Sequence, residues 1–144
     1  MNNKEFEMDY FKPGMTVPEI NKISMLGLAH IGDGVYELLT RTMLCAKGHS
    51  SVNELHKLTV SYVKAPAQAK AAEKIMPFLT DDEKAVYKRG RNTKVNSVPH
   101  NADIGQYHAA TGLEALFGWL YLRGFNERIS ELFSIIVQET ENAT

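Results

Sequence analysis

The chain has 144 residues, of which 44% are hydrophobic and 23% charged, and its net charge is −1. This length suits one domain with a real core, and no uninterrupted apolar stretch approaches the roughly 20 residues that a membrane span needs. The low net charge argues against a protein that coats nucleic acid through bulk charge. The N-terminal sequence MNNKEFEMDYFKPGM is acidic and polar, unlike a secretory or organellar signal, so a cytoplasmic location is expected.

Apolar residues recur at helical spacing along nearly the whole chain, which predicts an all-α fold. The predicted helices span residues 24–46, 51–62, 65–76, 80–90, 103–123 and 126 to about 137. Their boundaries rest on Ser51, Thr80 and Asn126 as capping residues at helix starts and on Gly48, Gly90 and Gly124 at helix ends. The single Cys45 cannot form an internal disulfide and is expected to be a small buried hydrophobe.

Basic residues cluster just before a long polar segment. Five of the 16 basic residues fall within the eleven positions 84–94, and the polar stretch RNTKVNSVPHNAD over 91–103 separates two helical halves of the chain. Loops of this length are often functional. The alternative is that the cations only stabilise the C-terminal end of a helix.

A second feature is the sequence LAHIGDGVYELLTR over residues 28–41, in which Asp33 lies between two glycines. Each glycine inside a helix is unfavourable by about 1 kcal/mol relative to alanine, so this pair indicates close approach of a backbone or a substrate. Helical spacing puts His30, Asp33, Glu37 and Arg41 on one face. The simpler interpretation is a solvated stripe containing a Glu37–Arg41 ion pair.

The third feature is Glu114, the one charged residue in the stretch ATGLEALFGWLYL over 110–122. A buried carboxylate must be compensated by a basic side chain, a metal ion or water. If Glu114 meets Asp33, two carboxylates from different helices could hold Mg²⁺, which commonly uses one or two carboxylates and completes its shell with water and phosphate. A Lys or Arg partner for Glu114 is the alternative, and spacing alone does not decide between them.

At these residues the sequence resembles the ribonuclease III family. LAHIGDGVYELL is similar to the family's signature helix, and TGLEALFGWLYL is similar to its second acidic helix, about eighty residues later. The segments YVKAPAQAK and KRGRN sharpen the resemblance to the Mini-ribonuclease III subgroup. The resemblance covers roughly residues 18–138. It implies that residues 1–144 form a single ribonuclease III-type catalytic domain, with an N-terminal extension over about 1–17 and no double-stranded-RNA-binding domain.

This resemblance implies an all-helical homodimeric endonuclease that hydrolyses double-stranded RNA with Mg²⁺, for which Mn²⁺ can substitute. The expected substrate is the precursor of large-subunit (23S) ribosomal RNA, and a large-subunit ribosomal protein is a candidate partner. The family's metal-binding acids fall on Asp33 and Glu114, which are therefore the expected catalytic residues. The other residues that we assign are Arg89, Arg91, Asn92 and Lys94 as RNA contacts, and Glu37 and Thr111 as candidates for contacting the metal ligands.

The sequence departs from the family at two acidic positions, which are held by Ala29 and Thr111. This favours a metal site with fewer carboxylate ligands and more water around the ion. His30 replaces an aromatic residue that larger family members present across their dimer interface. The alternative function is a catalytically inactive ribonuclease III-like domain that binds RNA or serves as a scaffold, although both remaining acids stand in settings that are otherwise unfavourable.

Overall fold

The protein is built from helices that pack around one long central helix. The computed structural model describes residues 7–94 and 97–142, with side chains described as far as residue 138, and these ranges contain no strand. The helices are α1 (Val17–Ile20), α2 (Met25–Ala46), α3 (Val52–Val63), α4 (Ala65–Ile75), the 3₁₀ helix η2 (Met76–Phe78), α5 (Asp81–Arg91), α6 (Ile104–Leu122) and α7 (Asn126–Asn142). The all-α prediction is confirmed. In the polar connection between α5 and α6, Val95 and Asn96 lie outside the described residues.

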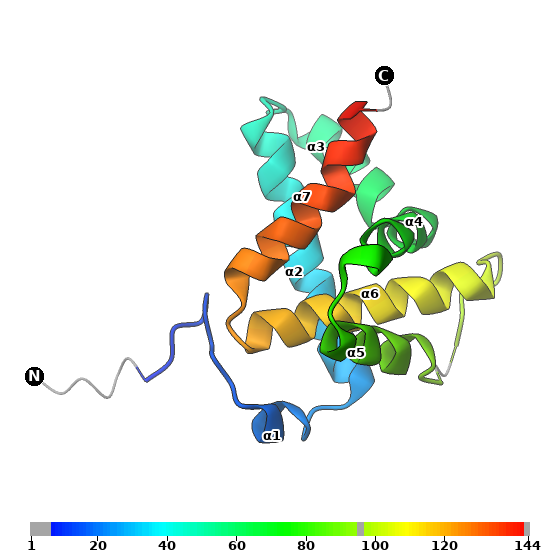
Figure 1. Ribbon diagram of the computed structural model, residues 1–144. Coiled ribbons are helices and arrows are strands. Elements are labelled where there is room, and N and C mark those ends of the chain that lie inside the picture. The colour runs from blue at the N-terminus through cyan, green and yellow to red at the C-terminus, as the bar shows by residue number, and fades with distance from the viewer. Residues whose placement is uncertain (1–6, 95–96, 143–144) are drawn as a thin grey trace, which may run out of the picture.

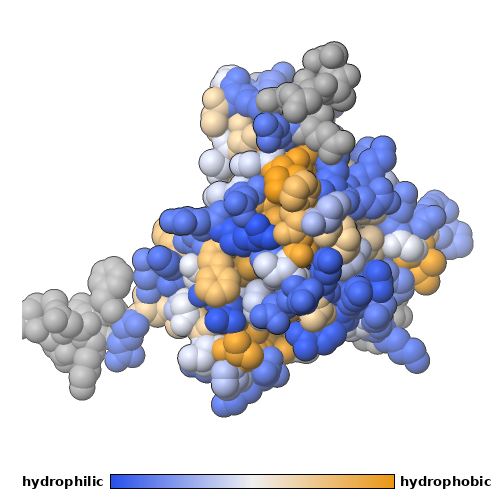
Figure 2. Space-filling view, in the orientation of Figure 1, coloured by the Kyte–Doolittle hydropathy of each residue, from blue (hydrophilic) through white to orange (hydrophobic). Residues whose placement is uncertain are grey.

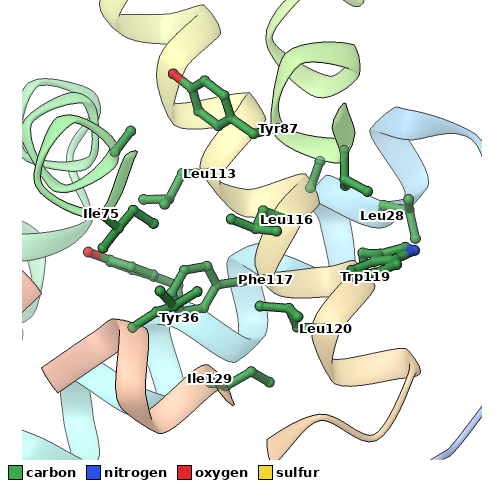
Figure 3. Packing of buried hydrophobic residues seen from close by; sticks show 14 of the residues in the cluster. Leu28, Tyr36, Ile75, Tyr87, Leu113, Leu116, Phe117, Trp119, Leu120 and Ile129 are labelled. Carbon is green, nitrogen blue, oxygen red and sulfur yellow. The ribbon is translucent and has the colours of Figure 1, made fainter. Parts of the chain in front are cut away.

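Helix α6 lies at the centre of the molecule because it is apolar on nearly every side. Helices α2, α4 and α5 all pack against it (Figure 1). Its side chains Leu113, Leu116, Phe117 and Leu120 are completely buried. Figure 3 shows Phe117 beside Tyr36 of α2, with the two ring centroids 5.3 Å apart and the rings edge to face. Glu114 is therefore carried by the most deeply buried helix of the fold.

Local capping signals place most helix ends where the sequence predicts them. The Ser51 hydroxyl accepts a hydrogen bond from the backbone N–H of Glu54. Thr80 and Glu83 form a complete capping box at the start of α5. After α2 and α6 the chain turns at Gly48 and Gly124, whose φ angles of +99° and +80° favour glycine.

Two predicted boundary residues are wrong. Gly90 does not end α5, which continues to Arg91; a β-carbon on Gly90 would lie 2.7 Å from the β-carbon of Ala115, so this glycine permits close helix packing. Asn126 is the first residue of α7 instead of its cap, and its side-chain amide donates to the carbonyl of Phe11 at 2.9 Å. In both cases the residue serves a contact with a distant segment of the chain, so a rule based on neighbouring residues assigns it the wrong place in the helix.

The described part of the N-terminal extension runs along the turn between α6 and α7. The backbone N–H of Met15 donates to the carbonyl of Leu122 at 2.7 Å, and the Tyr121 hydroxyl donates to the carbonyl of Tyr10. The extension ends at the short helix α1, which the sequence analysis did not predict and which begins with a capping box at Thr16. Residues 1–6 lie outside the described residues.

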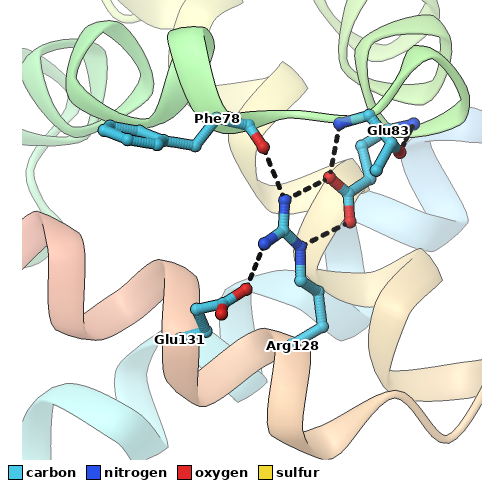
Figure 4. Close-up of polar contacts among 5 residues, drawn as sticks. Phe78, Glu83, Arg128 and Glu131 are labelled. Carbon is cyan, nitrogen blue, oxygen red and sulfur yellow. Dashed lines mark hydrogen bonds and ion pairs between the residues drawn. The ribbon is translucent and has the colours of Figure 1, made fainter.

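An ion pair with a buried carboxylate and a partly exposed arginine joins α5 to α7 (Figure 4). Arg128 donates to both carboxylate oxygens of Glu83 at 2.8 Å and to the carbonyl of Phe78 at 2.7 Å. Glu83 is only 4% exposed. Burial pushes the pKa of Glu83 up, but the hydrogen bonds from Arg128 and Thr80 outweigh this and lower it. Glu83, which completes the capping box of α5, therefore also holds α7 in place.

The face that Figure 2 shows is predominantly polar. No described helix combines the length and the apolar character required to cross a membrane. On the face over α7, α4 and α5, hydrophobic side chains form small separate patches within a hydrophilic surface (Figure 2). Cys45 is exposed, which contradicts the expectation that it is buried, because it lines an open hollow between α2 and α3 together with Leu55 and Thr59 and is not part of the core.

Candidate active site

The two helices that carry the predicted acids touch through their backbones. A β-carbon on Gly32 of α2 would lie 1.6 Å from the carbonyl oxygen of Glu114, and one on Gly118 of α6 would lie 2.1 Å from the carbonyl oxygen of Leu28. No side chain other than hydrogen fits at either position. The sequence analysis expected Gly32 to allow close approach, and the approaching group is the backbone of α6.

This crossing brings Asp33 and Glu114 together. Asp33 follows Gly32 and is exposed, whereas Glu114 is partly buried in the crossing. Burial and, to a smaller extent, the charge of the adjacent Asp33 carboxylate together raise the pKa of Glu114 to about 8. Within the described residues, no ion pair includes Glu114. The alternative of a basic partner for Glu114 therefore finds no support in the described part of the chain.

Two buried polar side chains that the sequence analysis did not single out lie behind the acids. Gln68 of α4 is 2% exposed and faces the carboxyl group of Glu114, whose pKa it lowers slightly. Tyr36 of α2 is 1% exposed; burial raises the pKa of its hydroxyl, and the neighbouring Tyr62 and Glu114 act in the same direction. A glutamine in the middle of an alanine-rich helix was the available sequence signal for Gln68. The sequence does not distinguish Tyr36 from any other aromatic residue of the core.

The donors present suit a hard cation that keeps much of its water. Asp33 and Glu114 supply carboxylate oxygens, and the described residues contain no group of three or more His, Cys, Asp or Glu side chains placed to hold a metal. The Thr111 hydroxyl donates to the carbonyl of Tyr107 at 3.0 Å, and Ala29 offers no ligand atom. Once both carboxyl groups are ionised they are two like charges without a basic partner, which a divalent cation would stabilise, and Mg²⁺ accepts as few as one or two carboxylates.

The remaining residues of the acidic stripe on α2 behave as a solvated surface. Glu37 pairs with Arg41 at 2.6 Å, as the spacing predicts, and both side chains are well exposed. His30 is also exposed. Glu37 thus already has a partner, and only Asp33 of this stripe interacts with α6 through its carboxylate.

The basic cluster lies beside the turn of α6 that carries Glu114. A β-carbon on Gly90 would lie 2.7 Å from the β-carbon of Ala115 and 3.0 Å from the α-carbon of Gly112, so the end of α5 that carries Arg89 and Arg91 packs against the α6 turn next to Glu114. Arg89 and Lys94 are exposed, and the Arg91 guanidinium stacks over the ring of Tyr87 at 5.7 Å. Asn92 caps α5 and accepts a hydrogen bond from Arg91 at 3.3 Å. The cluster is thus both a helix C-terminus and an exposed cationic surface.

Comparison with known proteins gives consistent matches over most of the chain. Residues 26–124 match the family described as Ribonuclease III domain. The chain is 44% identical over 127 residues to Mini-ribonuclease 3 of Thermoanaerobacter sp., covering 88% of this chain and 89% of that protein. It is 47% identical over 107 residues to Mini-ribonuclease 3 of Symbiobacterium thermophilum, covering 74% and 82%.

A solved structure has a similar fold. The X-ray crystal structure of a protein from Fusobacterium nucleatum superimposes with a TM-score of 0.73 at 30% identity, over 80% of this chain and 93% of that one. The family match includes both acid-bearing helices, α2 and α6, apart from the first residue of α2. The resemblance seen in the two acidic motifs is confirmed, and the chain belongs to the ribonuclease III family.

Proposed function

We propose that Asp33 and Glu114 form the catalytic centre of this protein and that they hold Mg²⁺ during hydrolysis of double-stranded RNA. The chain is a double-stranded-RNA endoribonuclease of the ribonuclease III type, and this family generally depends on Mg²⁺. The observation that carries the proposal is the meeting of two carboxylates from α2 and α6 with no basic partner among the described residues.

The two acids have different tasks in this arrangement. Asp33 is exposed and meets solvent and substrate directly, whereas Glu114 anchors the site against the core. When bound, the ion would polarise the scissile phosphate and lower the pKa of a coordinated water. Attack of a water oxygen on phosphorus with cleavage of the bond to the 3′ oxygen, loss of a proton from the water to solvent and protonation of the leaving oxygen would leave a 5′-phosphate and a 3′-hydroxyl. Because metal-free Glu114 holds its proton up to about pH 8, binding of the cation must release that proton near neutral pH.

RNA contacts are assigned to Arg89, Arg91, Asn92 and Lys94. Their support is exposure and position, since the cluster borders the α6 turn that carries Glu114. Basic and amide side chains at such a place suit phosphates and sugar hydroxyls of a duplex. The duplex would be recognised by shape, because the A-form major groove is too deep and narrow for side chains to read. The positioning roles that we assign to Glu37 and Thr111 have weaker support, since both side chains already have partners.

The active form is proposed to be a two-fold homodimer whose interface includes α2. A duplex has two strands of opposite polarity, and a two-fold assembly presents one acidic site to each. Light scattering at micromolar concentration should give twice the chain mass. A fully active monomer would contradict this assembly.

The physiological substrate is proposed to be the precursor of 23S ribosomal RNA in the cytoplasm, with a large-subunit ribosomal protein as a candidate partner. This rests on the similarity to the Mini-ribonuclease 3 proteins and on no particular residue. The 1–17 extension keeps no assigned role, and the single-domain organisation over 1–144 remains our proposal. Accumulation of unprocessed 23S precursor in cells depleted of this protein would support the assignment.

The catalytic proposal is tested by removing one charge at a time. Asp33→Asn and Glu114→Gln should each abolish cleavage of long duplex RNA while leaving a folded helical protein. The exposed acid Glu73 on α4 provides the matched control, and Glu73→Gln should cleave as the wild type does. If a variant cleaves within tenfold of the wild-type rate, the replaced residue is not part of the catalytic site. If the wild type still cleaves in the presence of a chelator, the reaction does not depend on a metal ion.

A further inference from the structure

Gln68 is the most unusual buried side chain outside the acid pair. It lies on α4 between alanines, is 2% exposed, and shares its helix face with Ala71, Ala72 and Ile75, all of which are buried. Its amide nitrogen is completely buried and makes no hydrogen bond of normal geometry with any described residue. An unsatisfied buried donor destabilises a fold, and each one calls for a specific explanation.

The group that Gln68 faces is the carboxyl group of Glu114. The amide of Gln68 lowers the pKa of Glu114, which is opposite to the effects of burial and of Asp33 on that pKa, although no hydrogen bond of normal geometry joins the two side chains. Within the described residues, no Lys or Arg forms an ion pair with Glu114. Gln68 is therefore the neutral donor side chain that acts on this carboxyl group from α4.

The surroundings of Gln68 leave its amide little freedom. Helix α4 packs directly on α6, and Tyr36 of α2 lines the same hollow as Ala67 and Ala71 of α4 and is near enough to Glu114 for its charge to raise the pKa of the Tyr36 hydroxyl. Tyr36 is itself held edge to face by Phe117 and by Phe133, with centroids 5.3 and 5.5 Å away. Close packing of this kind keeps side chains in single rotamers. A donor fixed in this way can select one orientation of the Glu114 carboxylate.

We propose that Gln68 is a positioning residue for Glu114. Its buried amide nitrogen donates a hydrogen bond to one oxygen of the ionised carboxylate, so that the other oxygen is directed toward Asp33 and the cation. Without a cation the amide nitrogen has no hydrogen-bond partner among the described residues, and hydrogen bonds in active sites commonly form fully only in the loaded site. Partners that orient metal-ligating carboxylates typically affect metal affinity or activity by 10- to 100-fold. This inference rests on the proposed function of Glu114.

The test replaces the amide while keeping the volume. Gln68→Met has a side chain of similar length without a donor, and Gln68→Leu serves the same purpose where the Met variant does not fold. The control is Thr40→Val, which also removes a buried polar group, a hydroxyl that donates to the carbonyl of Tyr36 at 2.9 Å. Three quantities are measured for each protein: Tm in chelator, the Mg²⁺ concentration at the midpoint of the Tm rise without RNA, and kcat and KM for duplex cleavage.

We expect the Gln68 variant to melt in chelator at or above the wild-type Tm, because an unsatisfied donor has been removed. Its Mg²⁺ midpoint should rise at least tenfold, kcat at low Mg²⁺ should fall at least tenfold, and KM for RNA should stay within threefold of wild type. Thr40→Val should lower Tm without moving the Mg²⁺ midpoint. A Gln68 variant with a midpoint within threefold of wild type overturns the proposal, as does a kcat loss that Thr40→Val reproduces.

The same measurements separate this proposal from that of the catalytic pair. If wild type shows a Mg²⁺-dependent Tm rise that Glu114→Gln loses and the Gln68 variant retains, the metal site stands and the role of Gln68 is wrong. If wild type shows no such rise, or Glu114→Gln still cleaves, the catalytic proposal fails and the role of Gln68 fails with it.

Discussion

The carbonyl oxygen of Glu114 occupies the space that a β-carbon on Gly32 would need, at only 1.6 Å from its position. The obstacle is backbone on both sides, so no side-chain rotation can relieve it. The separation of Asp33 from Glu114 is therefore determined by contact between two main chains. Gly34, two residues along α2, has no atom within 4 Å of the corresponding position.

These two glycines should respond in opposite ways to alanine. Gly32→Ala is expected to lower the free energy of unfolding by at least about 3 kcal/mol, the upper end of ordinary overpacking effects. Gly34→Ala should raise it by up to about 1 kcal/mol, because alanine is the better helix former and meets no neighbour. Urea unfolding of both variants measures the difference. Equal and small effects would contradict the close crossing of α2 and α6.

The stability of the metal-free protein should fall as pH rises between about 4.5 and 8. The folded protein keeps the Glu114 proton until its pKa of about 8, whereas the unfolded chain releases it near the ordinary value of 4.5. Over that window the folded state binds more protons, so each pH unit removes up to about 1.4 kcal/mol of stability. Tm measured in chelator against pH should show this slope in wild type and a shallower one in Glu114→Gln.

Mg²⁺ should reverse this trend in wild type, because the cation competes with the proton for the same carboxylate. The Tm increase on adding Mg²⁺ should therefore be larger at pH 8 than at pH 6 and small in Glu114→Gln at both. Glu114→Gln should also be at least as stable as wild type in chelator at pH 8. A large loss of stability in that variant would indicate a basic partner for Glu114 and would count against the metal site.

Replacing Arg89 and Arg91 by alanine should weaken duplex binding and make it less dependent on salt. Each phosphate contact that is lost reduces the slope of log K against log salt by somewhat less than one unit. Arg123→Ala is the control, since Arg123 also stacks on aromatic rings, those of Trp119 and Phe125, at the opposite end of α6. If all three substitutions leave the slope unchanged, the basic cluster only stabilises the end of α5.

The Glu83–Arg128 pair should matter for stability and not for chemistry. Arg128→Met leaves Glu83, 4% exposed, without its cationic partner and should lower the free energy of unfolding by about 3–5 kcal/mol. Glu131→Gln removes the exposed contact of the same arginine and should change it by less than about 1 kcal/mol. The rate of cleavage per folded molecule should be the same in both. A strong rate effect in Glu131→Gln would place this region in the RNA path.

The features that sequence predicts well here are those set within one or two helical turns. Ser51 and Thr80 start helices because their hydroxyls accept from nearby backbone N–H groups, and Gly48 ends one because it adopts a positive φ. The Glu37–Arg41 pair follows from i, i+4 spacing. Such signals need no knowledge of which helices pack together, so one sequence suffices to place them.

The features that sequence alone missed depend on partners far along the chain. The sequence around Gly90 predicts a helix end, whereas the glycine is needed because α6 lies against it. The sequence around Glu83 predicts only a capping role and gives no sign of the contact with Arg128 of α7. Gln68 gives no hint of its neighbour, Glu114, which lies 46 positions later. Helical periodicity shows that a face is buried without showing what covers it. For the acid pair itself, only the family resemblance indicated that α2 and α6 meet.

Contact between the main chains of α2 and α6 has a consequence for hydrogen exchange. Amide protons around Gly32 and Gly118 lie where two helices touch and where the core is most completely buried. Such amides exchange with solvent only when the whole domain opens, whereas those at exposed helix ends exchange through local fraying. We therefore expect the acids to lie on the slowest-exchanging part of the described chain. The residues proposed to contact RNA stand at the end of α5, where local opening is possible without separating Asp33 from Glu114.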